Sequence, residues 1–324
     1  MTNLNQIKQP VKKELEQFDR EFKSVLKTPV PLMNLILRYV TRRKGKRIRP
    51  LITFLTAGLT GNINEATVTA AVMIELLHTA TLVHDDVVDE AEKRRGIFTV
   101  NALWKNKAAV LIGDFLLSRG LLVSLEKERF DLLKIVAQAT REMSEGELLQ
   151  MEKARKLDIT EEVYFEIIRK KTASLIASCC AAGAASAGAD RQTIDKMWTF
   201  GEYAGIAFQI KDDLFDYQLI NKTGKPSAED IKERKLTLPL IYLLNRSSWT
   251  EKQKYLYTIR FNSGNKQKIK KLFQTIEASG GLQYAEEQMK AYHSKALEIL
   301  EDFPGGQYKK ALEDLLDYII RREK

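Results

Sequence analysis

The acidic stretch Asp85-Asp86-Val87-Val88-Asp89 occurs a second time as Asp212-Asp213-Leu214-Phe215-Asp216, so the chain carries two copies of an Asp-Asp-x-x-Asp pattern. Their first aspartates are 212 − 85 = 127 residues apart. In an α-helix, the first and last aspartates of each copy share one face, where their like charges repel. Mg²⁺ can offset this repulsion, because it prefers carboxylate oxygens and the oxygens of substrate phosphates. The two stretches therefore predict two helices that hold Mg²⁺ and a diphosphate between them.

Apolar side chains surround both acidic stretches, which argues against two solvated acidic surfaces. They are Leu82, Val83, Val87, Val88, Leu214 and Phe215. Carboxylates in an apolar setting need compensation. We expect Gly96 to end the first acidic helix and the segment from Asn221 to Pro226 to follow the second. Both clusters would then lie near helix C-termini, where the helix dipole disfavours each negative charge by about 0.3–1 kcal/mol.

The sequence predicts a helical protein. Of its 324 residues, 44% are hydrophobic, which is enough for a sizeable core. All seven prolines fall outside residues 51–225, and apolar residues at helical spacing fill that interval. No alternating strand pattern stands out, and the short turns do not resemble domain boundaries. We predict one all-α domain, residues 1–324, in which a large helical bundle surrounds a central cavity.

Charge and cysteine usage narrow the range of partners and compartments. The net charge is 52 − 43 = +9, which favours anionic partners such as diphosphates, nucleic acid or an acidic membrane surface. The two cysteines, Cys179 and Cys180, are adjacent and match no zinc or redox spacing, so we expect buried residues in a reducing cytosol. The polar N-terminus does not resemble a signal peptide. The uncharged run from Thr172 to Ala189 is too weakly apolar for a membrane span and predicts a close-packed central helix.

Three basic groups are placed to neutralise phosphate oxygens. One is Lys44-Gly45-Lys46-Arg47-Ile48-Arg49-Pro50, the second is Lys93-Arg94-Arg95-Gly96 after the first acidic stretch, and the third is Lys225, Arg234 and Lys235 after the second. Arginine supplies forked donors to phosphate and lysine a mobile point charge. Their positions beside the predicted acidic helices favour diphosphate binding over a purely solvated role.

These motifs together resemble the trans-isoprenyl diphosphate synthases, in particular long-chain polyprenyl diphosphate synthases of the octaprenyl type. The resemblance covers nearly the whole chain. Its motifs are Gly45-Lys46-x-x-Arg49, Glu75-Leu76-Leu77-His78, Asp85 to Asp89, Arg94-Arg95-Gly96, Gly113-Asp114, Gly146-Glu147, Lys171-Thr172, Phe208-Gln209, Asp212 to Asp216, Gly224-Lys225-Pro226, Asp230, and Lys235-x-Thr237-Leu238-Pro239. It implies the all-α isoprenoid synthase fold and a prenyltransferase that condenses isopentenyl diphosphate with an allylic diphosphate.

The resemblance also implies a role for each site residue. Asp85, Asp89 and Asp212 would bind Mg²⁺, three ions per active site, with Asp86, Asp213 and Asp216 as ligands or partners acting through water. The allylic diphosphate would be held by Arg94, Lys171, Lys225 and Lys235. Isopentenyl diphosphate would be held by Lys46, Arg49, His78 and Arg95. Lys171, Thr172 and Gln209 would act in catalysis, with the last two facing the reacting carbons.

Product length is expected to depend on residues just before the first acidic stretch. Ala80 and Thr81 lie five and four positions before Asp85, about one helical turn away. In family members with short products, bulky aromatics at these positions close the hydrocarbon pocket. Both residues are small here, so we expect a linear all-trans product of roughly C30–C45, suited to a quinone side chain. The alternative is that they only permit close helix packing.

Several other functions stay open at this point. A farnesyl or geranylgeranyl diphosphate synthase would share the same motifs. A class I terpene cyclase would share the first acidic stretch but usually has Asn, Ser or Thr, and Glu in its second. A metal-dependent phosphohydrolase using His84-Asp85 needs more histidines than the three present. A non-catalytic partner subunit tends to lose acidic residues, and all six are present here.

The resemblance implies a cytoplasmic homodimer. The substrates are small diphosphates, and we expect no nucleic-acid partner. Peripheral membrane contact would help a long prenyl product to leave, and the positive net charge would assist it.

Overall fold

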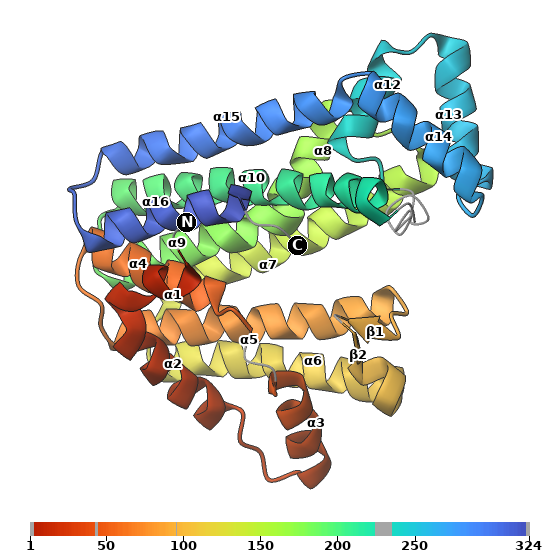
Figure 1. Ribbon diagram of the computed structural model, residues 1–324. Coiled ribbons are helices and arrows are strands. Elements are labelled where there is room, and N and C mark those ends of the chain that lie inside the picture. Colours follow the sequence, from red (N-terminus) through yellow and green to blue (C-terminus); the bar gives the residue numbers. More distant parts are fainter. Residues whose placement is uncertain (1–2, 43–44, 95, 224–234, 322–324) are drawn as a thin grey trace. The chain divides into compact units, whose positions relative to one another are not determined.

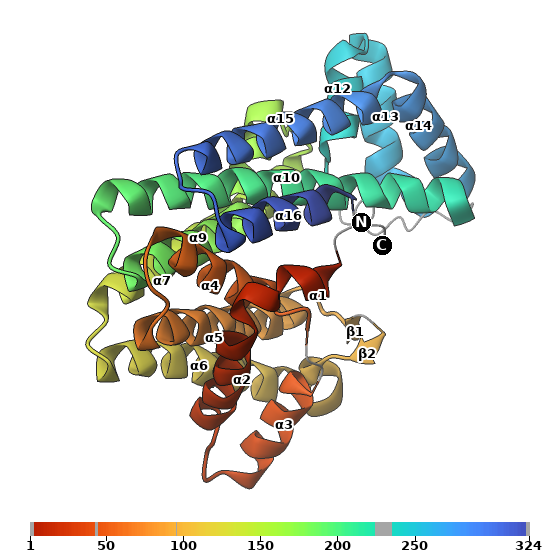
Figure 2. The same cartoon turned by 60° about the vertical axis from the view of Figure 1, so that its left-hand side comes forward.

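The computed structural model describes residues 3–42, 45–94, 96–223 and 235–321. In those ranges every regular element is a helix except for one short hairpin, which confirms the all-α prediction (Figures 1 and 2). Contacts divide the chain into two compact units that are interleaved in sequence. Unit 1 comprises Met1–Thr140, Ser178–Trp198 and Phe303–Leu312, and unit 2 comprises Arg141–Ala177, Thr199–Asp302 and Glu313–Lys324. The single-domain organisation stays a prediction.

Unit 1 contains the N-terminal half of the elements. These are α1 (Leu4–Ile7), η1 (Gln9–Val11), α2 (Lys12–Val25), α3 (Pro31–Thr41), α4 (Ile48–Thr60), α5 (Glu65–Val88), β1 (Lys93–Arg94), β2 (Ile97–Phe98) and α6 (Val100–Glu126). Helices α5 and α6 lie side by side in both views (Figures 1 and 2). The core of this unit includes the fully buried side chains of Phe18, Phe54, Leu76 and Leu116.

Unit 2 carries the second acidic stretch and the C-terminal helices. Its own elements are α8 (Glu161–Ile168), the π-helical segment η2 (Arg169–Ala173), α12 (Leu238–Arg246), α13 (Trp249–Phe261), α14 (Lys266–Ala278) and α15 (Gly281–Glu301). Four helices have residues in both units: α7 (Phe130–Lys156), α9 (Ser174–Ser186), α10 (Arg191–Thr223) and α16 (Gln307–Arg321). The core of unit 2 gathers Ile210, Leu238, Ile241, Ile276 and other buried residues from several of these helices.

The ends of the two acidic helices differ from the sequence-based expectation. Helix α5 ends at Val88 with Asp89 as its C-cap, so the first stretch lies at a helix C-terminus as predicted. Gly96 does not end this helix; it has φ +78° and lies between β1 and β2, where a hairpin needs a left-handed residue. Helix α10 continues to Thr223, seven residues past Asp216 (223 − 216), so the second stretch lies about two turns inside its helix. The helix-dipole argument therefore holds only for the first stretch.

The uncharged run that begins at Thr172 is a buried helix, as predicted. In α9, Cys179 and Cys180 are completely buried. Burial raises the pKa of the Cys179 thiol to about 12 and also raises that of Cys180 well above its ordinary value, so both stay protonated at neutral pH. A Cβ added to Gly183 would lie 2.5 Å from the carbonyl oxygen of Thr53, so this glycine allows α9 to approach α4.

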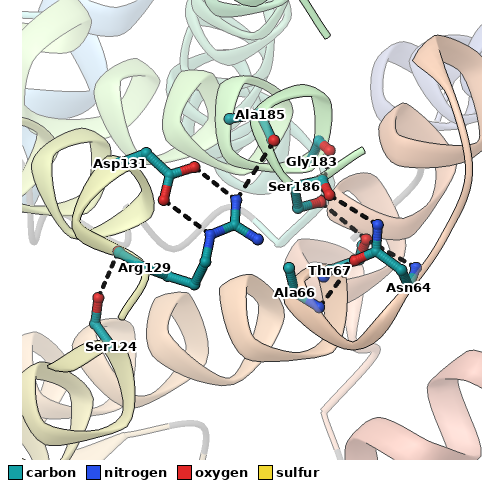
Figure 3. Close-up of polar contacts among 9 residues, drawn as sticks. All are labelled: Asn64, Ala66, Thr67, Ser124, Arg129, Asp131, Gly183, Ala185 and Ser186. Atoms are coloured by element: carbon teal, nitrogen blue, oxygen red, sulfur yellow. Dashed lines mark hydrogen bonds and ion pairs between the residues drawn. The ribbon is translucent and has the colours of Figure 1, made fainter. Parts of the chain in front are cut away.

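Polar contacts at the start of α5 fix it to the end of α9 (Figure 3). The side chain of Asn64 accepts hydrogen bonds from the backbone N–H groups of Ala66 and Thr67, and its Nδ2 donates to the carbonyl oxygen of Ser186 at 2.9 Å. Such caps satisfy helix N–H groups that have no intrahelical partner. Arg129 donates a hydrogen bond to the carboxylate of Asp131, and this pairing raises the pKa of the guanidinium and lowers the pKa of the carboxyl.

Two helices are long and apolar enough to cross a membrane by length and composition alone, namely α5 and α6. In its most apolar window α5 is 67% buried inside the protein, as expected of a core helix, whereas α6 is only 39% buried. The high burial of α5 argues against its insertion into a membrane. The lower burial of α6 leaves an exposed apolar face on that helix, which needs a separate explanation.

The contact at Gly183 generates a stability prediction. We expect Gly183→Ala to lower the free energy of unfolding by about 1–3 kcal/mol, because the clash with the backbone of α4 outweighs the better helix propensity of alanine. Urea denaturation measures this difference. Gly264→Ala is the matched control, since nothing lies within 4 Å of a Cβ there. Equal stability of the two variants would show that α4 and α9 can separate without loss.

Candidate active site

The first acidic stretch brings several predicted site residues onto one stripe of α5. His78, Thr81, Asp85 and Asp89 follow one another at intervals of three and four residues, which places them along the same helix face. Asp85 is half-buried and Asp89 is exposed. The structure therefore places two predicted metal ligands, one predicted isopentenyl diphosphate ligand and one pocket residue on a single surface.

Asp86 points to a different side of α5 and is 6% exposed. Its Oδ1 accepts a hydrogen bond from Nε of Arg94 at 2.6 Å, so the hairpin that carries Arg94 is fixed to the acidic helix end. Its backbone oxygen accepts from Nδ2 of Asn101 at the start of α6. Asp86 thus joins α5, β1 and α6, and it positions a predicted diphosphate-binding arginine.

The second acidic stretch has a buried middle aspartate of the same kind. Asp213 is 8% exposed and accepts two hydrogen bonds, from the hydroxyl of Tyr164 to Oδ2 at 2.7 Å and from Nε2 of Gln209 to Oδ1 at 2.8 Å. The Oε1 of Gln209 in turn accepts from the hydroxyl of Thr172 at 2.8 Å. The predicted catalytic pair Thr172 and Gln209 is therefore in direct contact, and Asp213 fixes the direction of the Gln209 amide.

In both stretches the middle carboxylate is used to organise neighbouring side chains. The sequence left two roles open for Asp86 and Asp213, metal ligand or partner of the ligands. Their burial and hydrogen bonds favour the second role. Asp212 is half-buried, and the side chain of Asp216 lies outside the described part of the structure.

Lys171 and Thr172 lie in η2, a π-helical segment between α8 and α9. Such segments are rare and occur often at functional sites. Gly146 in α7 makes room for this one, because a Cβ there would lie 2.7 Å from the backbone nitrogen of Lys171. The neighbouring Glu147 pairs with Nζ of Lys171 at 2.5 Å. The Gly146-Glu147 and Lys171-Thr172 motifs, 25 residues apart (171 − 146), therefore act as one structural element.

The basic loop before α4 shows a residue that sequence reasoning missed. Lys46 is exposed and Arg49 is half-buried. Between them, Arg47 has a left-handed backbone with φ 56°, uncommon for a residue other than glycine. Its guanidinium pairs with Glu75 at 3.0 Å and with Asp19 at 3.1 Å.

Two aromatic rings of α2 also lie close to the guanidinium of Arg47. Its guanidinium lies 5.2 Å from the ring centroid of Phe18 and 5.4 Å from that of Phe22. Arg47 therefore fixes the loop to α2 and α5. The signal was Glu75, the only charged residue between Ala70 and His84. A buried acid in an apolar helix predicts a basic partner.

The side chain of His84 packs against helix α6. A Cβ added to Gly113 in α6 would lie 2.1 Å from Nε2 of this histidine, so the glycine accommodates the imidazole. The same nitrogen lies 3.4 Å from Oδ1 of Asp114. The Gly113-Asp114 motif thus has a packing role, and His84 has an explanation that does not involve hydrolysis.

The pocket residues differ in their surroundings. Ala80 is 1% exposed and lies on the α5 face between Leu76 and His84, which both contact α6 glycines. Thr81 is half-buried and shares the stripe of Asp85. Close packing on α6 therefore accounts for the small side chain at position 80, whereas position 81 is the better candidate for a pocket wall.

Three predicted site residues fall outside what the structure describes. They are Arg95, Lys225 and the side chain of Asp216. Lys235 is described and half-buried, just before the N-cap of α12 at Thr237.

The donor chemistry of the acidic stretches fits Mg²⁺. Among the described residues, no group of three or more His, Cys, Asp and Glu side chains encloses a metal position. Mg²⁺ does not need such a cage, because it usually keeps waters and is bound by one or two carboxylates together with substrate phosphates. Asp85 and Asp89, on one accessible helix face, match that requirement.

The Arg47 cluster predicts a stability effect. We expect Arg47→Met to lower the free energy of unfolding by about 2–3 kcal/mol, because Glu75 and Asp19 would lose a shared, largely buried cation. In a double-mutant cycle with Glu75→Gln, the two losses should sum to more than the loss in the double variant. Arg20→Met, at an exposed position of α2, is the control in urea denaturation. Additive losses would show that Arg47 and Glu75 do not stabilise each other.

Comparisons with known proteins find a matching family and several similar proteins. The polyprenyl synthetase family matches residues 30–276. Octaprenyl diphosphate synthase of Escherichia coli K12 is 32% identical over 99% of this chain and 100% of its own length. A polyprenyl synthase from Caulobacter crescentus CB15, solved with calcium and isoprenyl diphosphate, is 32% identical with a TM-score of 0.89 over 99% of this chain and 98% of that one.

A shorter-chain enzyme is also similar in structure. The geranylgeranyl pyrophosphate synthase of Bacteroides thetaiotaomicron is 36% identical, with a TM-score of 0.83 over 98% of both chains. The similarity thus extends across enzymes of different product length, and in every case covers nearly the whole molecule. The chain belongs to the polyprenyl synthetase family and is an all-α prenyltransferase.

Proposed function

We propose that this prenyltransferase is a Mg²⁺-dependent long-chain polyprenyl diphosphate synthase. It would condense isopentenyl diphosphate with an allylic diphosphate to give a linear all-trans product of roughly C30–C45. The observation that carries the proposal is the hydrogen-bonded network of Thr172, Gln209 and Asp213 beside Lys171. Thr172 and Gln209 would act in catalysis next to a lysine that would bind diphosphate. The similarity to an octaprenyl diphosphate synthase supports the long product.

Mg²⁺ would be held by Asp85, Asp89 and Asp212, with three ions per active site. Bound there, it would neutralise the diphosphate charge and so make diphosphate a better leaving group. Calcium in the related polyprenyl synthase structure supports a divalent ion in the family. Mg²⁺ is preferred here because the acidic stretches offer only carboxylate oxygens and few ligands each.

Basic side chains would hold the two diphosphates in separate places. Arg94, fixed by Asp86, would bind the allylic diphosphate together with Lys171, Lys225 and Lys235. Lys46 and Arg49 would bind isopentenyl diphosphate together with His78 and Arg95. Arg47 would position the loop that carries Lys46 and Arg49.

Thr172 and Gln209 would stabilise the positive charge that forms when the allylic C–O bond breaks. Their oxygens are held by a hydrogen bond to each other, so little reorganisation is needed as the charge develops. The isopentenyl double bond then attacks the allylic carbon. The proton lost from the new chain passes to the departing diphosphate, so no side-chain base is required. Water must be excluded because it would trap the cation.

Chain length would be set by α5 and by residues of α6 between Val110 and Val123. Thr81 lies on the stripe of Asp85 and is too small to block a growing chain at that level. The similarity to a geranylgeranyl pyrophosphate synthase keeps a shorter product as the alternative. The two possibilities differ in product length alone and can be separated by one assay.

A second copy of this chain would cover α6. Beyond the kink at Lys105, five of its large apolar residues are more than a third exposed and fall within about 120° of the helix circumference: Val110, Leu111, Leu121, Leu122 and Leu125. A homodimer that buries this stripe would explain the low burial of α6. We further propose a single functional domain, a cytoplasmic location, no nucleic-acid partner and peripheral contact with a membrane.

Product analysis tests the proposed function. We expect the purified protein with Mg²⁺ to extend farnesyl diphosphate with radiolabelled isopentenyl diphosphate, and the dephosphorylated product to run in the long-chain range on reversed-phase chromatography. Asp85→Asn should reduce incorporation by orders of magnitude because it removes a metal ligand. Absence of incorporation by the unaltered protein would overturn the enzyme assignment. A product of geranylgeranyl length would overturn the long-chain assignment.

Substitutions at the two pocket positions separate a wall from a packing contact. We expect Thr81→Phe to shorten the product while the protein keeps its melting temperature, because the ring would enter the pocket. Ala80→Phe should lower the melting temperature, because position 80 packs against α6. The same chromatography and thermal unfolding of both variants measure this. Unchanged product length in Thr81→Phe would exclude it as a wall.

A further inference from the structure

Helix α13 presents an aromatic face that its packing in unit 2 does not use. The exposed fractions are 74% for Trp249, 59% for Tyr257 and 66% for Phe261. At about 100° per residue these three side chains fall within about 120° of the helix circumference. The opposite side of α13 is the packed one, with Ile259 fully buried and Tyr255 packed against the core of unit 2.

Two of the aromatic side chains are in contact, and Trp249 lies about two turns before them on the same side of the helix. The rings of Tyr257 and Phe261 are 5.0 Å apart between centroids. Single exposed apolar residues are normal on any protein, but aromatic side chains that group on one helix face mark an interaction site. Tyrosine and tryptophan in particular suit a boundary with an apolar side and a wet side.

Basic residues border this face and continue into the next helix. On α13, Lys254 and Arg260 are exposed beside the aromatic rings. Helix α14 packs against α13 at the same end of unit 2 (Figures 1 and 2). Its first turns expose four lysines, which are Lys266, Lys268, Lys270 and Lys271. From Arg246 to Thr275 the chain has eight basic residues and a single acidic one, Glu251.

We propose that α13 and the start of α14 form a docking surface for the anionic face of a lipid bilayer. Aromatic side chains would enter the headgroup region, and the lysines would be attracted to acidic lipid headgroups. An interfacial helix of this kind needs one apolar face and adjacent basic residues, which are both present. The inference rests on the proposed function only in naming a membrane partner for the enzyme; the surface itself is independent of the acidic stretches.

Binding to vesicles tests the surface. Full-length protein should sediment with phosphatidylglycerol–phosphatidylcholine vesicles and much less with phosphatidylcholine alone. Substituting Trp249, Tyr257 and Phe261 together by serine should weaken binding roughly tenfold or more, because it removes the inserted groups. Lys254→Gln with Lys270→Gln and Lys271→Gln should have a similar effect, lost at high salt. Phe130→Ser and Lys290→Gln are matched controls at exposed positions outside this surface and should bind normally.

Fluorescence gives a second readout. Of the three tryptophans, Trp104, Trp198 and Trp249, only Trp249 lies on this face. Vesicles should shift the emission of the unaltered protein to the blue, and Trp249→Phe should abolish the shift while sedimentation persists. Prenyl transfer from a soluble primer in lipid-free buffer should be normal in all these variants, so failure of the proposed function and failure of docking are separate results.

Two outcomes would overturn the proposal. One is that the unaltered protein does not bind anionic vesicles, which would leave the face to an acidic protein partner. The other is undiminished vesicle binding by the triple serine variant, which would place the lipid contact elsewhere on the chain.

Discussion

Mutual repulsion among carboxylates is the constraint that governs both halves of this molecule. Three aspartates in five helical residues cannot all point the same way without cost. The chain turns the middle one inward in each stretch, where Asp86 accepts from Arg94 and Asp213 accepts from Tyr164 and Gln209. In the first stretch, Asp85 and Asp89 lie on another face of the helix. One pattern thus separates into residues that can meet a cation and a residue that orders its neighbours.

Small residues set how closely the helices around these stretches approach. Gly183 permits contact between α9 and α4, Gly113 accepts the imidazole of His84, and Gly146 admits the π-helical segment. Each glycine leaves room for a close neighbour, which is backbone at Gly183 and Gly146 and an imidazole ring at Gly113. Such close packing leaves little tolerance for substitution. Gly146 in particular helps to determine where Lys171 and Thr172 lie.

Much of this could be predicted from the sequence, and the omissions have physical causes. The helical class and the buried run containing Cys179 followed from periodicity, and motif resemblance singled out Thr172 and Gln209 as candidates near the reacting carbons. The hydrogen bond between these two side chains was not predicted. The hairpin around Gly96 was missed because strands of two residues leave no alternating pattern. Arg47 was missed because one arginine in a basic run is indistinguishable from its neighbours until its partners Asp19 and Glu75 are folded next to it.

The hydrogen bonds of Gln209 fix which end of its side-chain amide faces each neighbour. An amide side chain has two ends of nearly equal shape and opposite dipole, and packing alone hardly distinguishes them. Because an ionised carboxylate only accepts, Asp213 can be satisfied only by the NH₂ end, which leaves the carbonyl end toward Thr172. An asparagine at position 213 could donate or accept, so both orientations would be populated. Molecules with the reversed amide would then present the positive end of its dipole to a developing cation, with no change in the backbone.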